Sequence, residues 1–302
     1  MAKSYTHSNN RVFVRVFPQP KSPLLTQNYE FGEFSTVSTP PTTITIFIYI
    51  NNNALAKGIV MKIYCNKSEL YRALNNAIQA VPSRSTSKIL EGVLIETKED
   101  EMIITGTDTF MVVESKLSAK CDGIADFVAP AALFANIIGK LPAEDVMMEY
   151  DSVKRVLSIQ SGRYRSEVIC FDSAEFPKVQ MKEPQKSITL NKESVRKLIR
   201  KTAFSASADE INGILTGVLC EIGDGNFRMV AVDAFRMAIY NEPLEDSIDA
   251  FKVVIPAKQL NKMSKIISDD GDETIRMELV DEKAVFSFDG TKVTLNTMNG
   301  RY

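Results

Sequence analysis

Residues 92–96 read Gly-Val-Leu-Ile-Glu, and residues 217–221 read Gly-Val-Leu-Cys-Glu, 125 positions further along the chain. Matches in one order at a nearly constant spacing indicate that a domain has been duplicated. A duplicated domain presents the same surface twice, which suits a repetitive ligand or a ring-like assembly better than a single catalytic pocket. Four further pairs keep the spacing of 125 or 126: 66–70 with 191–195, 107–110 with 232–235, 129–131 with 255–257, and 175–176 with 301–302.

The composition of the chain is that of a globular protein, with 302 residues, 44% hydrophobic and 25% charged. A repeat of about 125 residues matches a common domain size and can bury its own core. The net charge of −2 neither favours nor excludes nucleic acid, because it hides where the charges lie. The sequence has no run long enough to span a membrane and no signal-peptide pattern, so we expect a cytoplasmic protein.

Histidine and cysteine usage limits the chemistry that the repeats could carry. The single histidine, His7, lies outside them, which excludes Ser-His and Cys-His sites and histidine metal ligands there. Cys65, Cys121, Cys170 and Cys220 form no C-x-x-C pair, and we expect four buried, reduced side chains. We therefore predict neither a metal nor a cofactor.

Residues 1–60 differ from the rest of the chain. They are rich in Thr, Ser, Asn and Pro, match neither repeat, and carry a formal charge of +3. The alternating isoleucines of 44–50 indicate a lone β-strand. We expect a non-homologous, disordered extension, arising from translation that starts upstream of Met61; the alternative is an arm that binds an anionic partner.

Each copy predicts an α+β domain in which two amphipathic helices pack on antiparallel sheet. An asparagine, Asn66 or Asn191, is expected to cap the first helix, and a proline, Pro130 or Pro256, to occupy the first position of the second. The expected helices span 66–80, 131–141, 191–203 and 257–267; expected strands include 62–65, 93–96, 101–105, 111–117, 187–190, 218–222, 227–232 and 237–242.

The predicted domains are residues 61–182 and 183–302. Copy one continues beyond Phe176 through a proline-bearing linker, 177–184, into another domain, whereas copy two stops at Tyr302. We therefore expect the chain to be truncated.

Lysines and arginines concentrate on the predicted helices, where their geometry is fixed. Phosphate backbones are bound through such sequence-independent charge, although a solvated basic face is an equally common alternative. Acidic segments at 99–101 and 269–273 suggest that the two signs of charge lie on different faces, which favours nucleic acid. The helical cations are Lys192, Arg196, Lys197, Arg200 and Lys201; Lys258, Lys262 and Lys265; Lys67 and Arg72; and Lys140.

Three other features leave two interpretations open. Arg84 lies in a polar loop, where it could contact a phosphate or be an exposed residue without a role. Asp108 and Asp233 occupy equivalent positions, where carboxylates could bind a metal, but turn carboxylates that accept backbone N–H bonds are more typical. Residues 161–165, Ser-Gly-Arg-Tyr-Arg, predict a hairpin turn that could also touch nucleic acid.

Residues 215–218 and 232–237 combine small, apolar and cationic side chains around a strand pair. They could form a shallow apolar groove for a partner peptide, although plain sheet core is the default for most of them. Arg236 is the exception, because an arginine in an apolar run needs a partner or an open groove.

Residues 61–302 resemble the bacterial sliding clamp, the β subunit of DNA polymerase III. The motifs that carry the resemblance are weak singly, but their order and spacing extend over the whole region. They are 61–63 (Met-Lys-Ile), 89–93 (Ile-Leu-Glu-Gly-Val), 105–108 (Thr-Gly-Thr-Asp), 137–142 (Ile-Ile-Gly-Lys-Leu-Pro), 161–163 (Ser-Gly-Arg), 174–177 (Ala-Glu-Phe-Pro), 215–218 (Leu-Thr-Gly-Val), 232–237 (Val-Asp-Ala-Phe-Arg-Met) and 299–302 (Asn-Gly-Arg-Tyr).

The resemblance implies a non-catalytic processivity factor built from three such domains. Two chains would close head to tail into a homodimer ring lined by helices, with double-stranded DNA threaded through it. The ring would tether the polymerase III catalytic subunit, in its complex with the 3′–5′ exonuclease, as well as the clamp loader and other proteins that carry clamp-binding peptides. Without the third domain, this chain is not expected to close that ring.

Residue by residue, the resemblance assigns the peptide groove to Leu215, Val232, Ala234, Phe235, Arg236 and Met237. Ala234 stands where the family often has Gly, and Phe235 where His is common, which changes the pocket depth. Gly139-Lys140 stands where the family often has an arginine before Leu-Pro, which puts that DNA contact in doubt. The expected DNA-facing residues are Arg84, Lys140, Arg196, Lys197, Arg200, Lys258 and Lys262.

Two rival functions follow from the same sequence. One is a two-domain peptide-binding module that never encircles DNA. The other is a metal-dependent phosphodiesterase built on Asp108 and Asp233, which the absence of histidine and of a dense carboxylate cluster disfavours. Charge reversal at Arg196, Arg200 and Lys258 would weaken DNA association in a clamp and change nothing in a peptide module.

Overall fold

A computed structural model describes residues 3–7, 10–14, 60–178, 182–244, 250–268 and 271–302. The chain divides into two compact units, Met1–Lys57 and Gly58–Tyr302. In the first unit, β1 (Lys3–His7) and β2 (Asn10–Val14) form an antiparallel hairpin, which was not among the predicted elements. The strand predicted at 44–50 lies outside the described residues.

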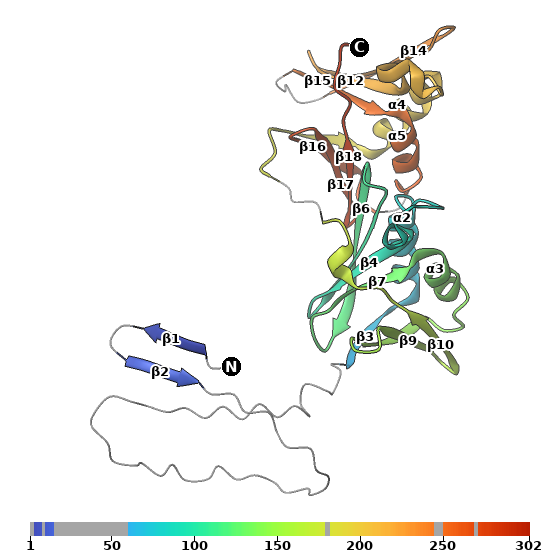
Figure 1. Ribbon diagram of the computed structural model, residues 1–302. Helices are drawn as coiled ribbons and strands as arrows, with labels where there is room; N and C mark the ends of the chain where they lie inside the picture. Colours follow the sequence, from blue (N-terminus) through green and yellow to red (C-terminus); the bar gives the residue numbers. More distant parts are fainter. Residues whose placement is uncertain (1–2, 8–9, 15–59, 179–181, 245–249, 269–270) are drawn as a thin grey trace, which may run out of the picture. The chain divides into compact units, whose positions relative to one another are not determined.

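The second unit contains the same series of elements twice (Figure 1). The first repeat consists of β3 (Val60–Asn66), α2 (Lys67–Ile78), η1 (Lys88–Glu91), β4 (Gly92–Thr97), β5 (Glu101–Thr107), β6 (Met111–Cys121), β7 (Asp126–Pro130), α3 (Ala131–Gly139), β8 (Asp145–Asp151), β9 (Val156–Ser161), β10 (Tyr164–Ile169) and η2 (Ser173–Glu175).

The second repeat consists of β11 (Lys186–Asn191), α4 (Lys192–Thr202), η3 (Ala203–Ser205), η4 (Glu210–Thr216), β12 (Gly217–Gly223), β13 (Asn226–Val232), β14 (Met237–Pro243), β15 (Phe251–Pro256), α5 (Ala257–Ser264), β16 (Thr274–Val280), β17 (Lys283–Phe288) and β18 (Thr291–Asn296). The predicted α+β class is confirmed.

Strand register confirms the duplication at the level of single residues. In the first repeat, Leu94 pairs with Thr105, and in the second, Leu219 pairs with Val230, each residue 125 positions further on. Gly92 pairs with Pro130, and Gly217 with Pro256. Because a shift of one residue would turn every side chain to the other face of a sheet, equal register means that both copies bury equivalent side chains.

The predicted asparagine caps are confirmed. Asn66 Oδ1 accepts the backbone N–H groups of Ser68 and Glu69, and Asn191 Oδ1 accepts that of Ser194 at 3.1 Å. The predicted position of the prolines is wrong by one residue. Pro130 and Pro256 have ψ angles of 112° and 129°, so they precede the helices as cap residues and the following alanines begin them.

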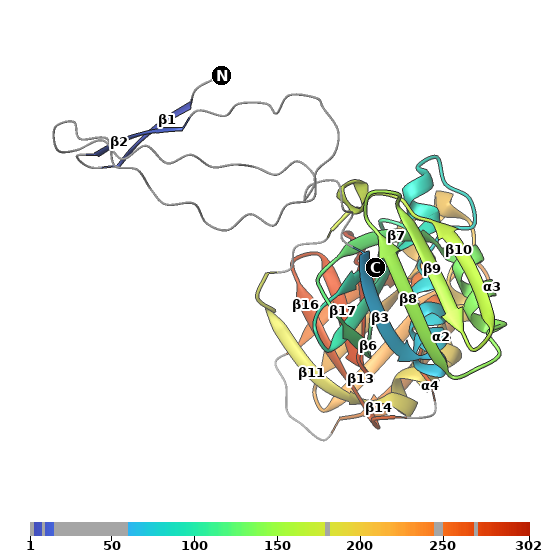
Figure 2. The same ribbon diagram turned by 90° about the horizontal axis from the view of Figure 1, so that it is seen from below.

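The helices pack on one side of the sheets. Leu70 and Leu74 of α2 share a core with Leu117 and Ala119 of β6, and a second core lies under α4 and α5. Figure 1 shows all four helices along one side of the unit, and Figure 2 shows β3, β8 and β9 side by side with α2 and α3 to one side of them. We call the exposed side of these helices the helix face and the opposite side of the sheets the strand face.

One strand pair joins the two repeats. The first half of β6 pairs antiparallel with β18, and the last residues of β6 pair with β3. Ser115 and Thr291 exchange a hydrogen bond of 2.9 Å across this junction, and Asn76 donates to both hydroxyls. Lys262 of α5 adds an ion pair with Asp108 at 2.8 Å. The junction is thus a continuous, buried sheet and not a loose linker.

Candidate nucleic-acid interface and peptide groove

The helix face is strongly basic. The four helices contain nine Lys or Arg residues and two Glu residues, a net +7 in a chain whose total is −2. The second repeat provides most of this charge, since α4 alone carries five of the nine cations. Such fixed positive charge suits a polyanion recognised by its backbone.

The sequence-predicted DNA-facing residues lie at different depths on this face. Arg84 is exposed in the loop after α2, Lys140 at the end of α3, Arg200 in the last turn of α4 and Lys258 in the first turn of α5. Arg196 is half-buried, and Lys197 forms an ion pair with Glu193 at 3.1 Å. Lys262 is held by Asp108, so its ammonium serves the junction between the repeats.

Two of the helical cations have structural roles that the sequence did not reveal. Lys192 is buried and contacts Asp289 at 2.5 Å, and its counterpart Lys67 donates to the Leu141 carbonyl at 2.7 Å. Each ammonium ties the start of a helix to a distant segment of the same repeat. The expectation that Lys192 is among the cations available to nucleic acid was therefore wrong, because its ammonium is buried against Asp289.

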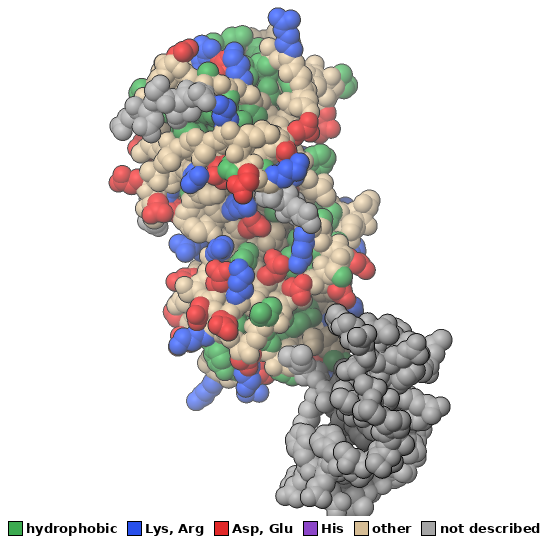
Figure 3. All heavy atoms as spheres, turned by 90° about the vertical axis from the view of Figure 1, so that its left-hand side faces the viewer, with side chains coloured by type: hydrophobic (Ala, Val, Ile, Leu, Met, Phe, Trp, Pro, Cys, Tyr) green, Lys and Arg blue, Asp and Glu red, His purple; other side chains and the backbone are tan. Residues whose placement is uncertain are grey.

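The strand face has a different charge pattern. Figure 3 shows Lys and Arg side chains intermixed with Asp and Glu over this face. Glu221 contacts both Arg228 and Lys252, and Glu101 contacts both Lys98 and Lys116. Paired charges of opposite sign cancel at a distance, so the helix face is the more attractive surface for a polyanion.

Asp108 and Asp233 are equivalent turn residues, as the more typical interpretation predicted. Asp108 Oδ1 accepts the N–H groups of Phe110 and Met111, and Asp233 Oδ1 accepts those of Phe235 and Arg236. The Phe235 N–H and then the Arg236 contacts hold the pKa of Asp233 below its usual range. Their carboxylates are engaged, and no His, Cys, Asp and Glu cluster that could hold a metal occurs among the described residues.

The hairpin predicted at 161–165 is confirmed. Ser161 ends β9, Tyr164 begins β10, and the two residues pair across the turn. Gly162 has a φ of +57°, in the left-handed region that glycine adopts without strain. Arg163 and Arg165 are exposed.

Five of the six predicted groove residues lie at the turn between β13 and β14, and the sixth, Leu215, lies in η4. Val232 ends β13, residues 233–236 form the turn, and Met237 begins β14. Leu215 in η4 and Val232 are half-buried, whereas Ala234, Phe235, Arg236 and Met237 are exposed, with Phe235 97% accessible. The exposed members of this set are therefore not sheet core, and exposed apolar side chains that lie together are typical of interaction surfaces.

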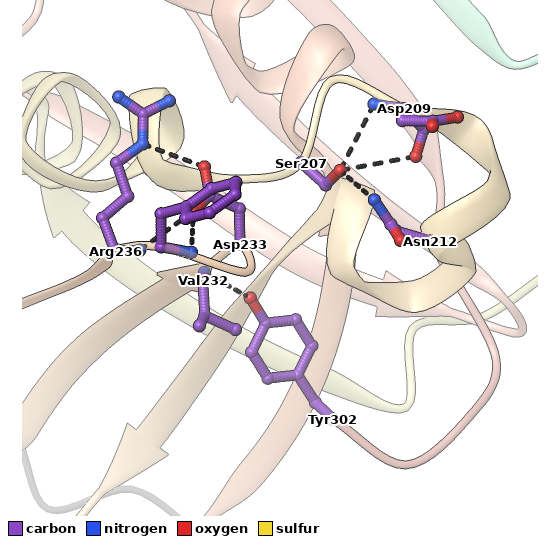
Figure 4. A network of polar contacts seen from close by, with 8 residues as sticks. Ser207, Asp209, Asn212, Val232, Asp233, Arg236 and Tyr302 are labelled. Atoms are coloured by element: carbon purple, nitrogen blue, oxygen red, sulfur yellow. Dashed lines mark hydrogen bonds and ion pairs between the residues drawn. The ribbon is translucent and has the colours of Figure 1, made fainter.

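Arg236 has the partners that the sequence analysis expected for an arginine in an apolar run. Its Nε donates to Asp233 Oδ2 at 3.0 Å, and its guanidinium lies 5.7 Å from the centre of the Phe204 ring. Figure 4 shows Arg236 and Asp233 facing one another beside the end of β13. The arginine thus holds the turn while its planar group remains accessible.

Three features of this region were missed by sequence reasoning. Phe204 and Ile211 are large exposed apolar side chains at the edge of the groove region. The Val232 N–H donates to Tyr302 Oη (Figure 4), and the Tyr302 hydroxyl donates to the Gly217 carbonyl. The only signal for Phe204 was an aromatic residue directly after the predicted helix 191–203, and the Tyr302 contacts span 70 and 85 residues.

The cysteines are not activated nucleophiles. Burial raises the pKa of the Cys65 and Cys220 thiols to about 12 and that of Cys121 to about 11. Cys170 and Cys220 are buried as predicted, but Cys65 and Cys121 are only half-buried and lie near the ends of β3 and β6. None of the helices that the structure describes is long and apolar enough to cross a membrane.

Comparisons with known proteins agree with this geometry. The profile of the DNA polymerase III beta subunit N-terminal domain matches residues 61–180, and that of its central domain matches residues 189–302. The beta sliding clamp of Staphylococcus epidermidis is 28% identical over 251 residues, which cover 80% of this chain and 66% of that protein.

Solved structures of the same family have a similar fold. A DNA polymerase III beta subunit from Eubacterium rectale superimposes with a TM-score of 0.77 at 30% identity, over 80% of this chain and 66% of that one. The sliding clamp of Bacillus subtilis superimposes with a TM-score of 0.76 at 27% identity and the same coverage. The chain therefore spans slightly less than two thirds of the length of the relatives that it matches.

Proposed function

Because the chain belongs to the DNA polymerase III beta subunit family, we propose that it is a DNA sliding clamp, a processivity factor without catalysis of its own. In this function the helix face lies against double-stranded DNA and contacts phosphates without reading sequence. The observation that carries the proposal is the net +7 of the four helices, which includes the buried Lys192 and the paired Lys262, on one side of a chain whose total charge is −2.

The proposed DNA-contacting residues are those that present a cation on the helix face. Arg200 and Lys258 are exposed on α4 and α5, and Arg84 and Lys140 extend the surface into the first repeat. Arg196 and Lys197 lie on the same helix as Arg200. Lys262 contributes its charge from within its ion pair with Asp108, so we assign it a smaller share of the contact.

The test is duplex binding measured by fluorescence anisotropy over a series of salt concentrations. A variant combining Arg196→Gln, Arg200→Gln and Lys258→Gln should bind more weakly than the unchanged chain. Its plot of log affinity against log salt should be less steep, by about 0.9 for each phosphate that the variant no longer neutralises.

A charge-matched control comes from the strand face. Lys116 and Lys120 alternate with the core residues Leu117 and Ala119 of β6, so they point away from the helices, and Lys252 is exposed on β15. Replacing these three lysines by Gln should leave the affinity and the salt slope unchanged. Equal reductions of affinity in both triple variants would contradict the proposal, and no reduction in either would favour a module that binds peptides only.

We further propose that the region around Val232–Met237 binds short peptides of partner proteins, including the polymerase III catalytic subunit and the clamp loader. Support comes from the exposed Phe235 and Met237 on the turn that follows the half-buried Val232. Apolar anchors beside an accessible guanidinium suit an extended peptide with hydrophobic side chains and a carboxylate.

Two further parts of the proposal concern organisation. We propose domain limits at 61–182 and 183–302, and a cytoplasmic protein. Head-to-tail assembly of the family kind would join domains of different chains into a ring. The continuous β6–β18 sheet supports such assembly, because it joins two domains of this fold edge to edge within one chain.

A further inference from the structure

The positive charge of the helix face is divided unequally between the two repeats. Helices α4 and α5 contain seven Lys or Arg residues and one Glu, a net +6, whereas α2 and α3 contain two Lys or Arg residues and one Glu, a net +1. Because the two repeats have the same fold, the second repeat shows which positions of that fold can hold cations. The same positions of the first repeat show what takes their place.

Two cations of the second repeat have neutral counterparts in the first. Counted from the first residues of α2 and α4, Tyr71 is the counterpart of Arg196, at an offset of 125. Counted from the first residues of α3 and α5, Gly139 is the counterpart of Lys265, at an offset of 126. A tyrosine and a glycine therefore stand on the first repeat where an arginine and a lysine stand on the second.

Tyr71 and Gly139 form one contact between α2 and α3, which lie side by side (Figure 1). A Cβ atom at position 139 would lie 3.0 Å from Tyr71 Cε2, which is tighter than ordinary van der Waals contact, and 3.5 Å from Tyr71 Oη. The tyrosine thus occupies the space that a side chain of residue 139 would need. The contact places the tyrosine hydroxyl at the end of α3.

Tyr71 is nevertheless open to solvent, with 41% of its surface accessible. Its hydroxyl has no hydrogen-bond partner within the part of the chain that the structure describes. Arg72 follows it on α2, Lys140 follows Gly139, and both of these cations are exposed. A positioned hydroxyl donor beside two cations suits a phosphate oxygen, which tyrosine side chains contact in nucleic-acid complexes.

We propose that Tyr71 contacts the DNA backbone on the first repeat by donating a hydrogen bond from its hydroxyl to a phosphate oxygen. This inference rests on the proposed function, because it requires a duplex on the helix face, and it adds a neutral contact where the second repeat has cations. A neutral donor binds phosphate without releasing a counterion. The contact of Tyr71 therefore persists as salt is raised, while the contacts of α4 and α5 weaken.

Removal of the hydroxyl alone gives the first test. Tyr71→Phe keeps the ring against Gly139, so the packing of α2 on α3 is retained. Duplex affinity, measured by fluorescence anisotropy over a salt series, should fall about fivefold at every salt concentration. The slope of log affinity against log salt should stay that of the unchanged chain, because no cation has been removed.

Tyr64 provides a matched control on the strand face. It is 47% accessible, and it follows the buried Ile63 on β3, so its side chain points away from the helices. Tyr64→Phe removes the same hydroxyl from a tyrosine of similar exposure and should leave both the affinity and the salt slope unchanged.

A second variant tests the position of residue 71 by a gain of charge. Tyr71→Arg gives the first repeat the residue that the second repeat has at its equivalent position, Arg196. If residue 71 lies against a phosphate, the salt slope should become steeper by about 0.9, because one more counterion is released on binding. Tyr64→Arg adds the same charge on the strand face and should leave the slope nearly unchanged.

The results distinguish failure of this inference from failure of the proposed function. If the triple variant of Arg196, Arg200 and Lys258 binds DNA like the unchanged chain, the proposed function itself fails. If the triple variant binds more weakly while Tyr71→Phe and Tyr71→Arg bind like the unchanged chain, the helix face binds DNA and Tyr71 is not a contact. A shallower salt slope for Tyr71→Phe would also overturn the inference, because the tyrosine would then act by positioning its neighbouring cations.

Discussion

At the residue scale, equivalent positions of the two repeats keep the same physical task. Asp108 and Asp233 each fold a tight turn by accepting two backbone N–H groups, and Lys67 and Lys192 each anchor a helix start. The aspartate role followed from turn chemistry alone. The lysine role could not be predicted, because Asp289 lies 97 residues from Lys192 in the sequence.

Replacing Lys192 tests its structural role. The Lys192–Asp289 pair is nearly enclosed, with side chains 6% and 14% accessible. Lys192→Met would leave a buried carboxylate without its cation, and we expect the free energy of unfolding to fall by about 3 kcal/mol. Urea unfolding followed by circular dichroism measures the change.

The double variant Lys192→Met with Asp289→Asn provides the control. Asn tolerates the left-handed φ of +47° at position 289 and removes the unpaired charge, so part of the stability should return. If Lys192→Met alone unfolds at the same urea concentration as the unchanged chain, the pair is not structural. If the second substitution destabilises the chain further, the buried charge is not the cause.

At the element scale, periodicity predicted most of the helices and strands but not how far they extend or what they join. The alternating pattern indicated a strand at 111–117, and β6 in fact continues to Cys121 because its second half pairs with β3. The β6–β18 pairing across the repeats could not be predicted, since local sequence carries no signal for a partner strand so far away. Residues 232–237 of the groove were predicted from the sequence, but Phe204, which lies in η3, was not.

Three strands of the second repeat meet in one charge cluster on the strand face. Glu221 of β12 contacts Lys252 of β15 and Arg228 of β13. The Lys252 ammonium, followed by the Arg228 guanidinium, holds the pKa of the Glu221 carboxyl below its ordinary value of 4.5. A carboxyl with a lowered folded-state pKa adds stability above its unfolded-state pKa and loses that contribution as pH falls through the folded-state value.

The expected outcome is a pH-dependent effect of Glu221→Gln. At neutral pH the variant should unfold at lower urea concentration than the unchanged chain. The gap should begin to close as pH drops below about 4.5 and vanish below the lowered pKa of the folded state. Glu273→Gln, which alters an exposed carboxylate in the segment before β16, should show little difference across the same range. A gap that widens on acidification would refute this explanation.

At the scale of the whole molecule, positive charge concentrates on the helices, whereas the strand face carries both signs of charge. The helices hold a net +7, so the remaining residues hold −9 of the chain's total of −2. The sequence predicted the basic helices, because helical cations can be identified directly, but the suggested separation of the two signs between faces does not extend to the strand face, which mixes them. It did not reveal which cations are free to meet a ligand, because burial of Lys192 and pairing of Lys262 depend on the folded repeats.

The central claim is that duplex DNA lies against the helix face, and photocrosslinking from single positions tests it most directly. A photoreactive amino acid is placed at position 200 on α4 or at position 120 on the strand face of β6, and each variant is irradiated with a labelled duplex. Crosslinking to DNA should be strong from position 200 and near background from position 120, and should decline as salt is raised. Equal crosslinking from both positions, or more from position 120, would contradict the claim.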